Sequence, residues 1–487
     1  MRTFFTVIGF FVFAFSAIAQ LDTAMVRTVG GIRNEEARDV IETADGGYLL
    51  FGTTGSADES SSKMYLVKIS EQLGFEWSQV YGENSVNVGV SISPDGNGNY
   101  FLIGHTLNLS SSYDLLVMKV NSIGEIIWSD SYGESDWDFA NDAIVLPSGE
   151  LVIIGETWSF GQQNQVYCTK ISSDGEFIWE AVYGGDGFDL GFTISPVPNS
   201  TDQFFIGGTT QNESNREAFL ALVDAETGEI SWQTSETTST DSGQVILDTY
   251  ALEDSTVLCA GYFLADNRRQ KIIKKFDFDG ELLWENILDD DGNQQLNAVT
   301  EHNGEILFAG RSDIYGLGGL SMYLLRTNSS GGYSAAAAFG GDQDDFGNDV
   351  IVDSQGRAVY VGGSSSYGGS LHDFYLVRIP NVSLVSEYVL DIADYQDEFA
   401  TEIAENSFVH SEVRVFPNPA KTEITINHGL TASPKAKIYD LSGRIVLTIP
   451  LTPTSSTINL ETLQAGIYFI RLQGEGVSSN AIKFLKQ

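Results

Sequence analysis

Basic residues are scarce in this chain of 487 residues. It contains 26 Lys and Arg residues against 66 Asp and Glu residues, which gives a formal net charge of -40. Nucleic-acid binding depends on contacts between basic side chains and phosphates, so this balance argues against a nucleic-acid partner. An anionic membrane surface would repel the chain for the same reason. The acidic excess fits a soluble protein with a solvated surface.

Cysteine is nearly absent, because only Cys168 and Cys259 occur. The two lie two repeats apart in the repeat pattern described below. Positions so far apart do not bring their Cα atoms within the range that a disulfide needs. We therefore expect two buried, reduced cysteines.

Long apolar runs are confined to the start of the chain. Arg2 is followed by the apolar run Phe4–Phe15 and by an A-x-A sequence that ends at Ala19. This order is typical of a secretory signal peptide over residues 1–19, cleaved before Gln20. No later run of about 18 apolar residues occurs, so no membrane span is expected.

Catalytic motifs are lacking as well. The five histidines form neither an HExxH motif nor a close pair, and no G-x-S-x-G elbow or P-loop is present. Lone acidic residues are too numerous in this chain to identify a catalytic pair. The sequence therefore predicts no enzymatic activity and no cofactor.

Five tryptophans recur at an almost constant interval. Adjacent members are 51, 51, 53 and 52 residues apart. This tryptophan ladder consists of Trp77, Trp128, Trp179, Trp232 and Trp284. A period near 52 is typical of a repeat architecture, in which each repeat buries its apolar face against the next. We predict that the ladder packs between neighbouring repeats.

Each repeat contains four short runs with the composition of strands. In the first repeat a strand begins at Asp39, and the others are residues 48–53, 64–69 and 76–81. The runs are rich in β-branched and aromatic residues and are bounded by turn residues. Four strands in about 50 residues are typical of a propeller blade.

Each repeat has a glycine in its second strand, and the series of these glycines indicates seven blades. These glycines are Gly52, Gly104, Gly155, Gly207, Gly261, Gly310 and Gly362. The seventh repeat ends at Pro380 without a fourth strand, whereas residues 25–31 resemble a fourth strand and precede the first repeat. We predict an all-β, seven-bladed propeller over residues 20–380, closed by its N-terminal strand so that no sheet edge stays open.

The composition changes twice after the propeller. Residues 381–412 hold eight Asp or Glu and no Lys or Arg, which predicts an acidic connector. Residues 413–487 hold eight Lys or Arg and four Asp or Glu, a net charge of +4 in a chain of -40. Their short strands predict a small β-sandwich.

Three motifs in this last segment occur in a recognisable order. They are V-F-P-N-P-A from Val415, Y-D-L-S-G-R from Tyr439 and A-G-I-Y from Ala465. The segment resembles the type A C-terminal sorting domain of the type IX secretion system. The resemblance implies that the secretion machinery reads residues 413–487 and carries the protein across the outer membrane, and that this domain is usually cleaved afterwards. It implies no enzymatic residue.

A second ladder consists of residues with a side-chain oxygen. This oxygen ladder, with steps of 51 or 52 residues, is Glu35, Asn87, Asp138, Asp189, Asp241, Asn293 and Asp345. Four residues further on lies a looser ring: Asp39, Ser91, Asp142, Thr193, Val245, Asn297 and Asp349. Both sets are expected near the central channel, where one blade crosses to the next. The ladder oxygens are expected to cap loop N–H groups; the alternative is a Ca²⁺ site, since such oxygens suit a hard cation.

Two tryptophans lie outside the tryptophan ladder. Trp137 is in a crossing loop between blades, and Trp158 is in the loop between the second and third strands of the third repeat, followed by Phe160. These two loop types are expected on the same face of the propeller, together with Tyr315 and Tyr367. Exposed aromatic rings there could stack on sugars or dock a protein, although single exposed aromatics also occur without a function.

The sequence thus predicts a secreted or cell-surface propeller that acts as a binding or adhesion module. Its ligand is unknown, with a glycan or a protein as candidates. One alternative is a secreted hydrolase of glycans or peptides with its site at the channel mouth. Another is a purely structural component of the cell surface.

Overall fold

The computed structural model describes three parts of the chain. The first is residues 24–382 without 58–60, 83–85, 108–111, 162, 213–214, 237–242, 289–291, 315–317 and 368–370, and the second is residues 388–391. The third is residues 414–486 without 418, 428–434, 440–444, 453–454, 461, 465, 475–476 and 479–481. The predicted signal peptide, with Ala19 and Gln20, lies outside the described residues.

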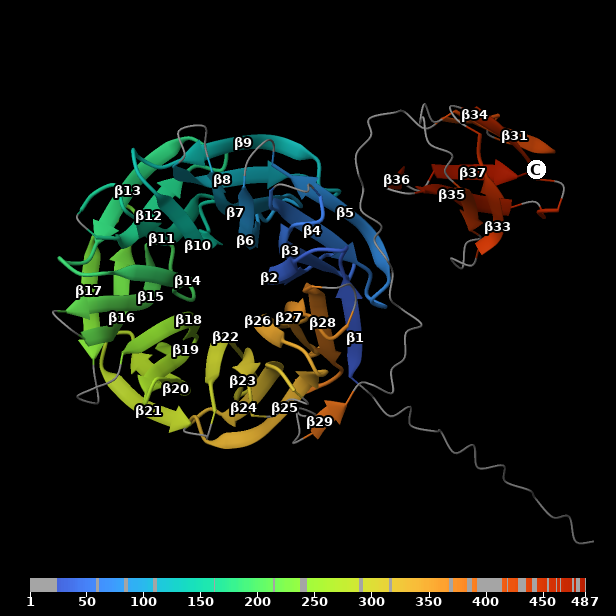
Figure 1. Cartoon of the computed structure of the whole chain (residues 1–487). Helices are drawn as coiled ribbons and strands as arrows, with labels where there is room; N and C mark the ends of the chain where they lie inside the picture. The colour runs from blue at the N-terminus through green and yellow to red at the C-terminus, as the bar shows by residue number, and fades with distance from the viewer. Residues whose placement is uncertain are drawn as a thin grey trace, which may run out of the picture.

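Seven antiparallel sheets surround one axis, each with its first strand innermost (Figure 1). Blade 1 consists of β2 (Glu35–Glu42), β3 (Tyr48–Thr54), β4 (Lys63–Ile69) and β5 (Phe75–Tyr81). Blade 2 consists of β6 (Asn87–Pro94), β7 (Tyr100–Leu107), β8 (Tyr113–Val120) and β9 (Ile126–Tyr132). Blade 3 consists of β10 (Asp138–Val145), β11 (Leu151–Thr157), β12 (Gln165–Ile171) and β13 (Phe177–Tyr183). Blades 4 and 5 are β14 (Leu190–Pro196), β15 (Gln203–Asn212), β16 (Asn215–Asp224) and β17 (Ile230–Glu236); and β18 (Gln244–Leu252), β19 (Thr256–Ala265), β20 (Arg268–Asp277) and β21 (Leu282–Leu288). Blade 6 is β22 (Gln294–His302), β23 (Glu305–Ser312), β24 (Ser321–Asn328) and β25 (Tyr333–Gly340), and blade 7 is β26 (Asp345–Val352), β27 (Ala358–Ser364), β28 (Asp373–Ile379) and β1 (Met25–Val29). The predicted seven-bladed propeller is confirmed.

The N-terminal strand closes the ring. β1 pairs antiparallel with β28, from Met25 opposite Arg378 to Val29 opposite Phe374, and forms the outer strand of blade 7 (Figure 1). Val29 is fully buried in the core shared by blades 7 and 1. The predicted closure is therefore confirmed, and β1 covers the edge that β28 would otherwise expose.

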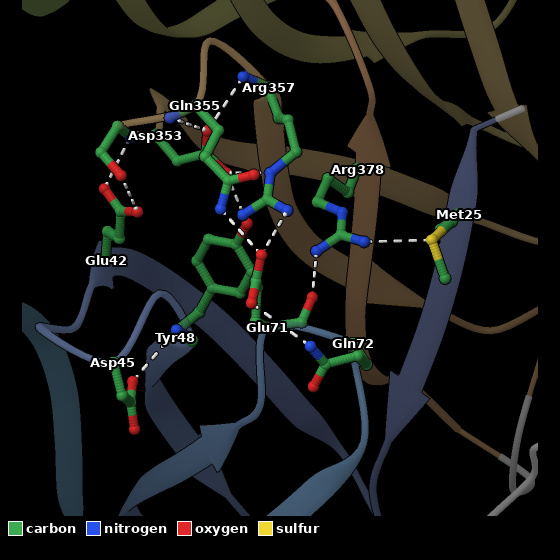
Figure 2. A network of polar contacts seen from close by, with 12 residues as sticks. Met25, Glu42, Asp45, Tyr48, Glu71, Gln72, Asp353, Gln355, Arg357 and Arg378 are labelled. Atoms are coloured by element: carbon green, nitrogen blue, oxygen red, sulfur yellow. Dashed lines mark hydrogen bonds and ion pairs between the residues drawn. The ribbon is translucent and has the colours of Figure 1, made fainter. Parts of the chain in front are cut away.

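Polar side chains reinforce the contact between blades 7 and 1 (Figure 2). The Tyr48 hydroxyl of blade 1 donates to Asp353 Oδ2 of blade 7 at 2.6 Å. Arg357 pairs with Asp353 and lies 3.4 Å from Glu71 Oε1, back in blade 1. Burial and the Asp353 carboxylate raise the pKa of Tyr48 to about 12, so this phenol stays a donor at neutral pH. The seam is thus held by strand pairing, by apolar packing and by a charged network.

The tryptophan ladder packs between blades as predicted. Trp232 Nε1 donates to the Phe278 carbonyl of the next blade at 2.9 Å, and its ring lies on Gly280. Gly280 has φ of +87°, and a Cβ there would come within 2.9 Å of the indole. The same glycine contact repeats for the other four tryptophans, at Gly124, Gly175, Gly228 and Gly331. The turn glycine is therefore required both for the backbone and for the neighbouring ring.

Lysines sit directly opposite most ladder tryptophans within a blade. Lys68 pairs with Trp77 across β4 and β5, and its ammonium lies 3.0 Å from Asp45 Oδ1. Equivalent ion pairs join Lys119 to Asp95, Lys170 to Glu150 and Lys275 to Asp254. Because Lys68, Lys170 and Lys275 are buried, the paired carboxylates satisfy charges that would be costly alone. Cys168 and Cys259 are buried and reduced, as predicted.

The segment after the propeller adds one strand to it. β29 (Tyr388–Asp391), inside the predicted acidic connector, pairs parallel with β25 and extends blade 6 to five strands (Figure 1). The outer strand of this blade lacks the ladder tryptophan and carries Ala335–Ala338 instead, of which Ala335, Ala337 and Ala338 are buried. Residues 383–387 and 392–412 of the predicted connector lie outside the described residues.

The C-terminal part folds into two small sheets around its own core. One contains β30 (Arg414–Phe416), β31 (Glu423–Asn427) and β34 (Ser455–Asn459), and the other contains β32 (Lys435–Tyr439), β33 (Ile445–Pro450), β35 (Gly466–Gly474), β36 (Val477–Ser478) and β37 (Ile482–Lys486). Apolar residues of both sheets, including Ile424, Ile438 and Phe484, form the core. This is the predicted sandwich. No helix in the described parts of the chain is long and apolar enough to cross a membrane.

Candidate functional site

Two loop types meet on one face of the propeller, called here the upper face. The loops that connect consecutive blades end where each inner strand begins, and the loops between second and third strands start nearby. Trp137 immediately precedes β10, and Trp158 immediately follows β11. The backbone N–H of Trp158 donates to the Trp137 carbonyl at 2.8 Å. The structure thus brings the two off-ladder tryptophans together.

Six aromatic side chains from blades 2 and 3 and the following loop form an aromatic cluster. Its members are His105, Tyr113, Trp137, Phe139, Trp158 and Phe188. The Trp137 and Trp158 rings lie edge to face with centroids 6.4 Å apart. Tyr113 and Phe139 are 5.0 Å apart, and Phe188 is 6.0 Å from Trp158. Edge-to-face contacts at these distances are favourable beyond their apolar area.

The cluster is anchored at its base and open at its rim. His105 lies at the base, where burial lowers its pKa to about 4, so the imidazole is neutral at pH 7. Trp158 is half-buried among the other rings, whereas Trp137 is 45% exposed. Two exposed carboxylates, Glu134 and Asp136, lie in the same loop as this ring, and Asp136 Oδ1 accepts the Trp137 backbone N–H at 3.1 Å. A flat apolar ring beside acceptor groups is therefore available at the surface.

The other predicted aromatic residues do not join the cluster. Phe160 is 45% exposed and stacks on Tyr167 of its own blade, with centroids 6.3 Å apart. Tyr367 belongs to blade 7, where its hydroxyl donates to the Gly340 carbonyl at 2.8 Å and its ring contacts Tyr375. Tyr315 lies outside the described residues. Spacing and loop type alone did not separate Tyr367, which packs within the blades, from the tryptophans.

Members of the oxygen ladder accept hydrogen bonds from their own loops. Each of four carboxylates accepts the N–H of the residue four positions earlier. The acceptor and donor pairs are Glu35 with Gly31 at 2.9 Å, Asp138 with Glu134 at 2.7 Å, Asp189 with Gly185 at 2.7 Å, and Asp345 with Gly341 at 2.9 Å. Hydroxyls of the loops between second and third strands, such as Thr54 and Ser366, donate to the same carboxylates. In blades 1, 3, 4 and 7 these oxygens therefore join the loop before the inner strand to the end of the second strand or the loop after it.

Strand register changes the ladder in two blades. Glu35 in blade 1 is the inner-strand residue that pairs with the residue two positions after the second-strand glycine. Gln244 occupies this position in blade 5, and Gln294 occupies it in blade 6. Asn293, which chain spacing selected, is exposed and hydrogen-bonds Asp313. Asp241 lies outside the described residues, and Asn87 is buried. In the described parts of the chain, no three His, Cys, Asp or Glu side chains are grouped so that they could hold a metal ion.

Every inner strand contains a bulge, and the residue after it lies toward the channel. This inner ring consists of Asp39, Ser91, Asp142, Thr193, Asp248, Ala298 and Asp349. The predicted members Val245 and Asn297 are therefore wrong, because the bulges of blades 5 and 6 fall later than constant spacing assumes. Acidic members occupy the odd-numbered blades. Small hydroxyl or methyl side chains occupy the even-numbered ones.

The inner-ring carboxylates join each odd-numbered blade to the next blade. Asp142 of blade 3 accepts the Ile194 N–H of blade 4 at 3.0 Å, and Asp248 of blade 5 accepts the Val299 N–H of blade 6 at 2.7 Å. Asp39 and Asp349 do the same for Ile92 and Val40 at 2.8 and 3.0 Å. Each donor follows a bulge, where the ladder leaves an N–H unpaired. The carboxylates thus satisfy backbone groups.

Burial dominates the titration of the inner ring. It raises the pKa of Asp248 to about 7, although three donors to this carboxyl oppose the shift. Burial likewise raises the pKa values of Asp39, Asp142 and Asp349, and for Asp349 the nearby Asp39 charge adds to the effect. These groups have raised pKa values in a central position, but their oxygens already serve as acceptors for the blades.

One residue set on the upper face was missed by the sequence reasoning. Arg269 and Arg311 approach each other between blades 5 and 6 through a shared contact with Gln295. A local signal for it exists, since Asp266 and Asn267 both have positive φ and form a tight hairpin turn between β19 and β20. That turn replaces the longer loop of blades 1, 2, 3, 6 and 7 and extends β20 so that Arg269 reaches the upper face.

Comparisons with known proteins bear on the two parts of the chain separately. Residues 414–487 match the family described as the secretion system C-terminal sorting domain. A comparison with curated proteins found no significant match.

Solved structures resemble the propeller at low sequence identity. BamB from Moraxella catarrhalis is 12% identical, with 73% of this chain and 100% of that chain covered and a TM-score of 0.42. The β-propeller domain of the Trilobed protease from Pyrococcus furiosus is 10% identical, with 72% and 94% covered and a TM-score of 0.42. PorZ of Porphyromonas gingivalis, a surface component of the type-IX secretion system, is 12% identical, with 93% and 81% covered and a TM-score of 0.29. These similarities concern the fold alone.

The family match agrees with the motifs from Val415, Tyr439 and Ala465, and it confirms the predicted sorting domain. Such a domain directs its protein to the type IX secretion machinery. Residues 414–487 are therefore a secretion-system C-terminal sorting domain, and the chain is a β-propeller protein exported to the cell surface or secreted.

Proposed function

We propose that the protein is a binding module that takes a glycan on the upper face of its propeller, at the aromatic cluster. The observation that carries this proposal is the 45% exposure of Trp137 inside a cluster that lies outside the blade-packing repeat. A flat indole offers a stacking surface for the C–H face of a sugar ring. The acidic groups of Asp136 and Glu134 beside it can accept hydrogen bonds from sugar hydroxyls.

The net charge and the local charge favour a neutral sugar at this position. Asp136 and Glu134 are both exposed, and no Lys or Arg lies between Gly124 and Lys170. An anionic group placed on Trp137 would therefore meet nearby carboxylates. A neutral sugar presents no charge to them and retains both stacking and hydrogen bonding.

The hydrolase alternative remains as a second proposal with less support. Glycoside hydrolysis generally uses two carboxyls that face the substrate, one of them often with a raised pKa. Asp39, Asp142 and Asp248 have raised pKa values, but each accepts a backbone N–H of the next blade. Binding without hydrolysis is therefore the reading that the geometry favours. Release of reducing ends from a polysaccharide panel would contradict it.

The test uses glycan-array binding of the full chain and two matched tryptophan variants. Trp137→Ala should weaken binding by about 2 kcal/mol, roughly thirtyfold, because aromatic anchors dominate such contacts. Trp128→Ala should leave the upper face intact but lower stability by about 3 to 5 kcal/mol, because its ring packs on Gly175 of the next blade.

Thermal melting separates the two effects. Trp137→Ala is expected to melt close to the unmodified protein, because nearly half of its side chain is already exposed. If Trp137→Ala destabilised the fold as much as Trp128→Ala and left glycan binding unchanged, the ring would be a packing residue and the proposed site would be wrong. Absence of binding across the array would favour a structural role.

A further inference from the structure

Two guanidinium groups on the upper face share one neutral acceptor. Arg269 Nη1 of blade 5 and Arg311 Nη2 of blade 6 both donate to Gln295 Oε1, the latter at 2.9 Å. The Arg269 guanidinium also lies over the Tyr262 ring, 4.7 Å from its centroid. A cation held against an aromatic face keeps a fixed orientation. The two positive charges are therefore held side by side.

A chain of amides fixes the acceptor between them. Gln295 Nε2 donates to Asn297 Oδ1, and Asn297 Nδ2 donates to the Gly347 carbonyl of blade 7 at 2.7 Å. This order leaves Gln295 Oε1 as the atom that faces the guanidiniums. The arrangement is anchored to backbone at one end and presents N–H donors of both arginines at the other.

The arginine pair differs from three other arginines of this acidic chain in its contacts. Arg38, Arg326 and Arg357 each pair with a carboxylate. Within the described parts of the chain, neither Arg269 nor Arg311 does. Burial, and after it the Arg269 charge, lower the pKa of Arg311, whereas Tyr262 and the carboxylates of Glu36 and Asp344 raise it. The two like charges repel each other, and a bound anion would offset that repulsion.

Arg269 and Gln295 occupy the same blade positions as two members of the aromatic cluster. Arg269 pairs with Leu264, three residues after the second-strand glycine, and Tyr113 pairs with Leu107 at the same offset. Gln295 likewise occupies the position of Phe139, because each lies opposite the residue that follows that glycine. The arginine pair and the cluster therefore lie on the same face, at equivalent junctions between different blades.

We infer that Arg269 and Arg311 form an oxyanion-binding subsite that takes a carboxylate or sulfate group carried by the glycan. This inference rests on the proposed function for the source of the anion. Guanidinium groups bind carboxylates and other oxyanions through paired N–H donors, and Gln295 Oε1 accepts a hydrogen bond from each of the two groups. The aromatic cluster would take a neutral sugar of the same glycan, and the arginine pair an acidic one.

The experiment compares acidic sugars with their neutral counterparts on the full chain. An array presents oligogalacturonates and their methyl esters, and sulfated oligogalactans and their desulfated forms. The unmodified protein should bind one acidic class at least about tenfold more tightly than its neutral form. The class that it prefers distinguishes a carboxylate from a sulfate. The preference should weaken as salt rises, because exposed charges are screened.

Arginine variants then locate the preference. The double variant Arg269→Gln and Arg311→Gln should lose it, while Arg38→Gln, which removes one exposed charge already paired with Glu36, should keep it. Thermal melting provides a readout that a structural role would not give. Removing one of two opposing charges should leave the melting temperature of Arg311→Gln unchanged or higher, whereas a structural role predicts a lower one.

Two further arms keep this inference separate from the proposed function. Sulfate and acetate, titrated as free ions, should raise the melting temperature of the unmodified protein more than that of the double variant, even if no glycan binds. Equal binding of acidic and neutral sugars, together with equal ion effects in both proteins, would overturn the subsite. A Glu-rich peptide that bound as tightly as the acidic sugars, and also lost binding in the double variant, would overturn the glycan assignment.

Discussion

Ring closure through β1 predicts a large cost for one substitution in that strand. In Val29→Asp, the mutated side chain is fully buried in the native protein, in the core between blades 7 and 1. Losing the burial of a valine costs about 1.5 to 3 kcal/mol, and a buried, unpaired carboxylate costs several more. The strand can avoid the second cost only by detaching from β28.

Detachment sets the upper limit of the effect. It would remove a five-residue ladder, from Met25 opposite Arg378 to Val29 opposite Phe374. At about 1 kcal/mol for each hydrogen bond, the loss is roughly 5 kcal/mol, and the lost valine burial brings the total to about 6.5 to 8 kcal/mol. For a propeller of this size that corresponds to a drop of about 9 to 11 °C in melting temperature, since unfolding entropy is about 2.1 cal/mol/K per residue. An exposed β28 edge should also promote aggregation.

The measurement is thermal melting of the full chain beside a control in the same strand. Met25 is 42% exposed, so Met25→Asp should shift stability by less than about 1 kcal/mol. If Val29→Asp and Met25→Asp melted alike, β1 would not close the ring in solution, and another segment would have to cover β28.

Three other predictions follow from the export signal, the inner ring and the oxygen ladder. Truncation after Asn381 should leave a folded propeller in the periplasm, detected by fractionation, and its arrival at the cell surface would contradict the sorting role. For the inner ring, Asp248 has a pKa near 7 when folded and near 3.9 when unfolded, so the unfolded state releases its proton first as pH rises from about 4 to 7. This stabilising contribution is present at low pH and is lost as pH rises through 7. The melting temperature at pH 5 should therefore exceed the melting temperature at pH 8, and the difference should be larger in the unmodified protein than in Asp248→Asn. Equal differences in the two proteins would refute the raised pKa of Asp248. Melting curves with millimolar Ca²⁺ and with a chelator should coincide, because the ladder carboxylates already cap loop N–H groups, whereas a Ca²⁺-dependent increase would reveal a cation site.

Much of the fold could be predicted because the residues that pack between blades recur at a constant spacing. Each ladder tryptophan needs a glycine in the next blade, as Trp232 needs Gly280, and this requirement keeps both at a constant spacing. The closure was visible because the seventh repeat lacks a strand that residues 25–31 supply. The sorting domain was visible because its motifs are local in sequence.

Constant spacing failed where strand pairing, rather than chain length, fixes the register. In blade 5 the inner strand begins at Gln244, eight residues after the end of β17 at residue 236, and the inner-ring residue is Asp248 and not Val245. The pairing of Ile246 with Gly261 determines this position, and no sequence period reports it. For the same reason, the oxygen-ladder position of blade 6 is held by Gln294 and not by Asn293.

The candidate binding residues were harder to predict because they occupy positions that packing leaves unconstrained. The tryptophan ladder, the lysine–acid pairs and the inner ring already connect each blade to its neighbours. The position at the upper junction can therefore hold Tyr113 between blades 2 and 3 and Arg269 between blades 5 and 6 without changing the fold. A period shows which residues a repeat requires, so residues that differ from the period are where a specific ligand could be recognised. In this protein the residues that differ from the period include the exposed Trp137 of the aromatic cluster and the pair Arg269 and Arg311, which lie on the same face.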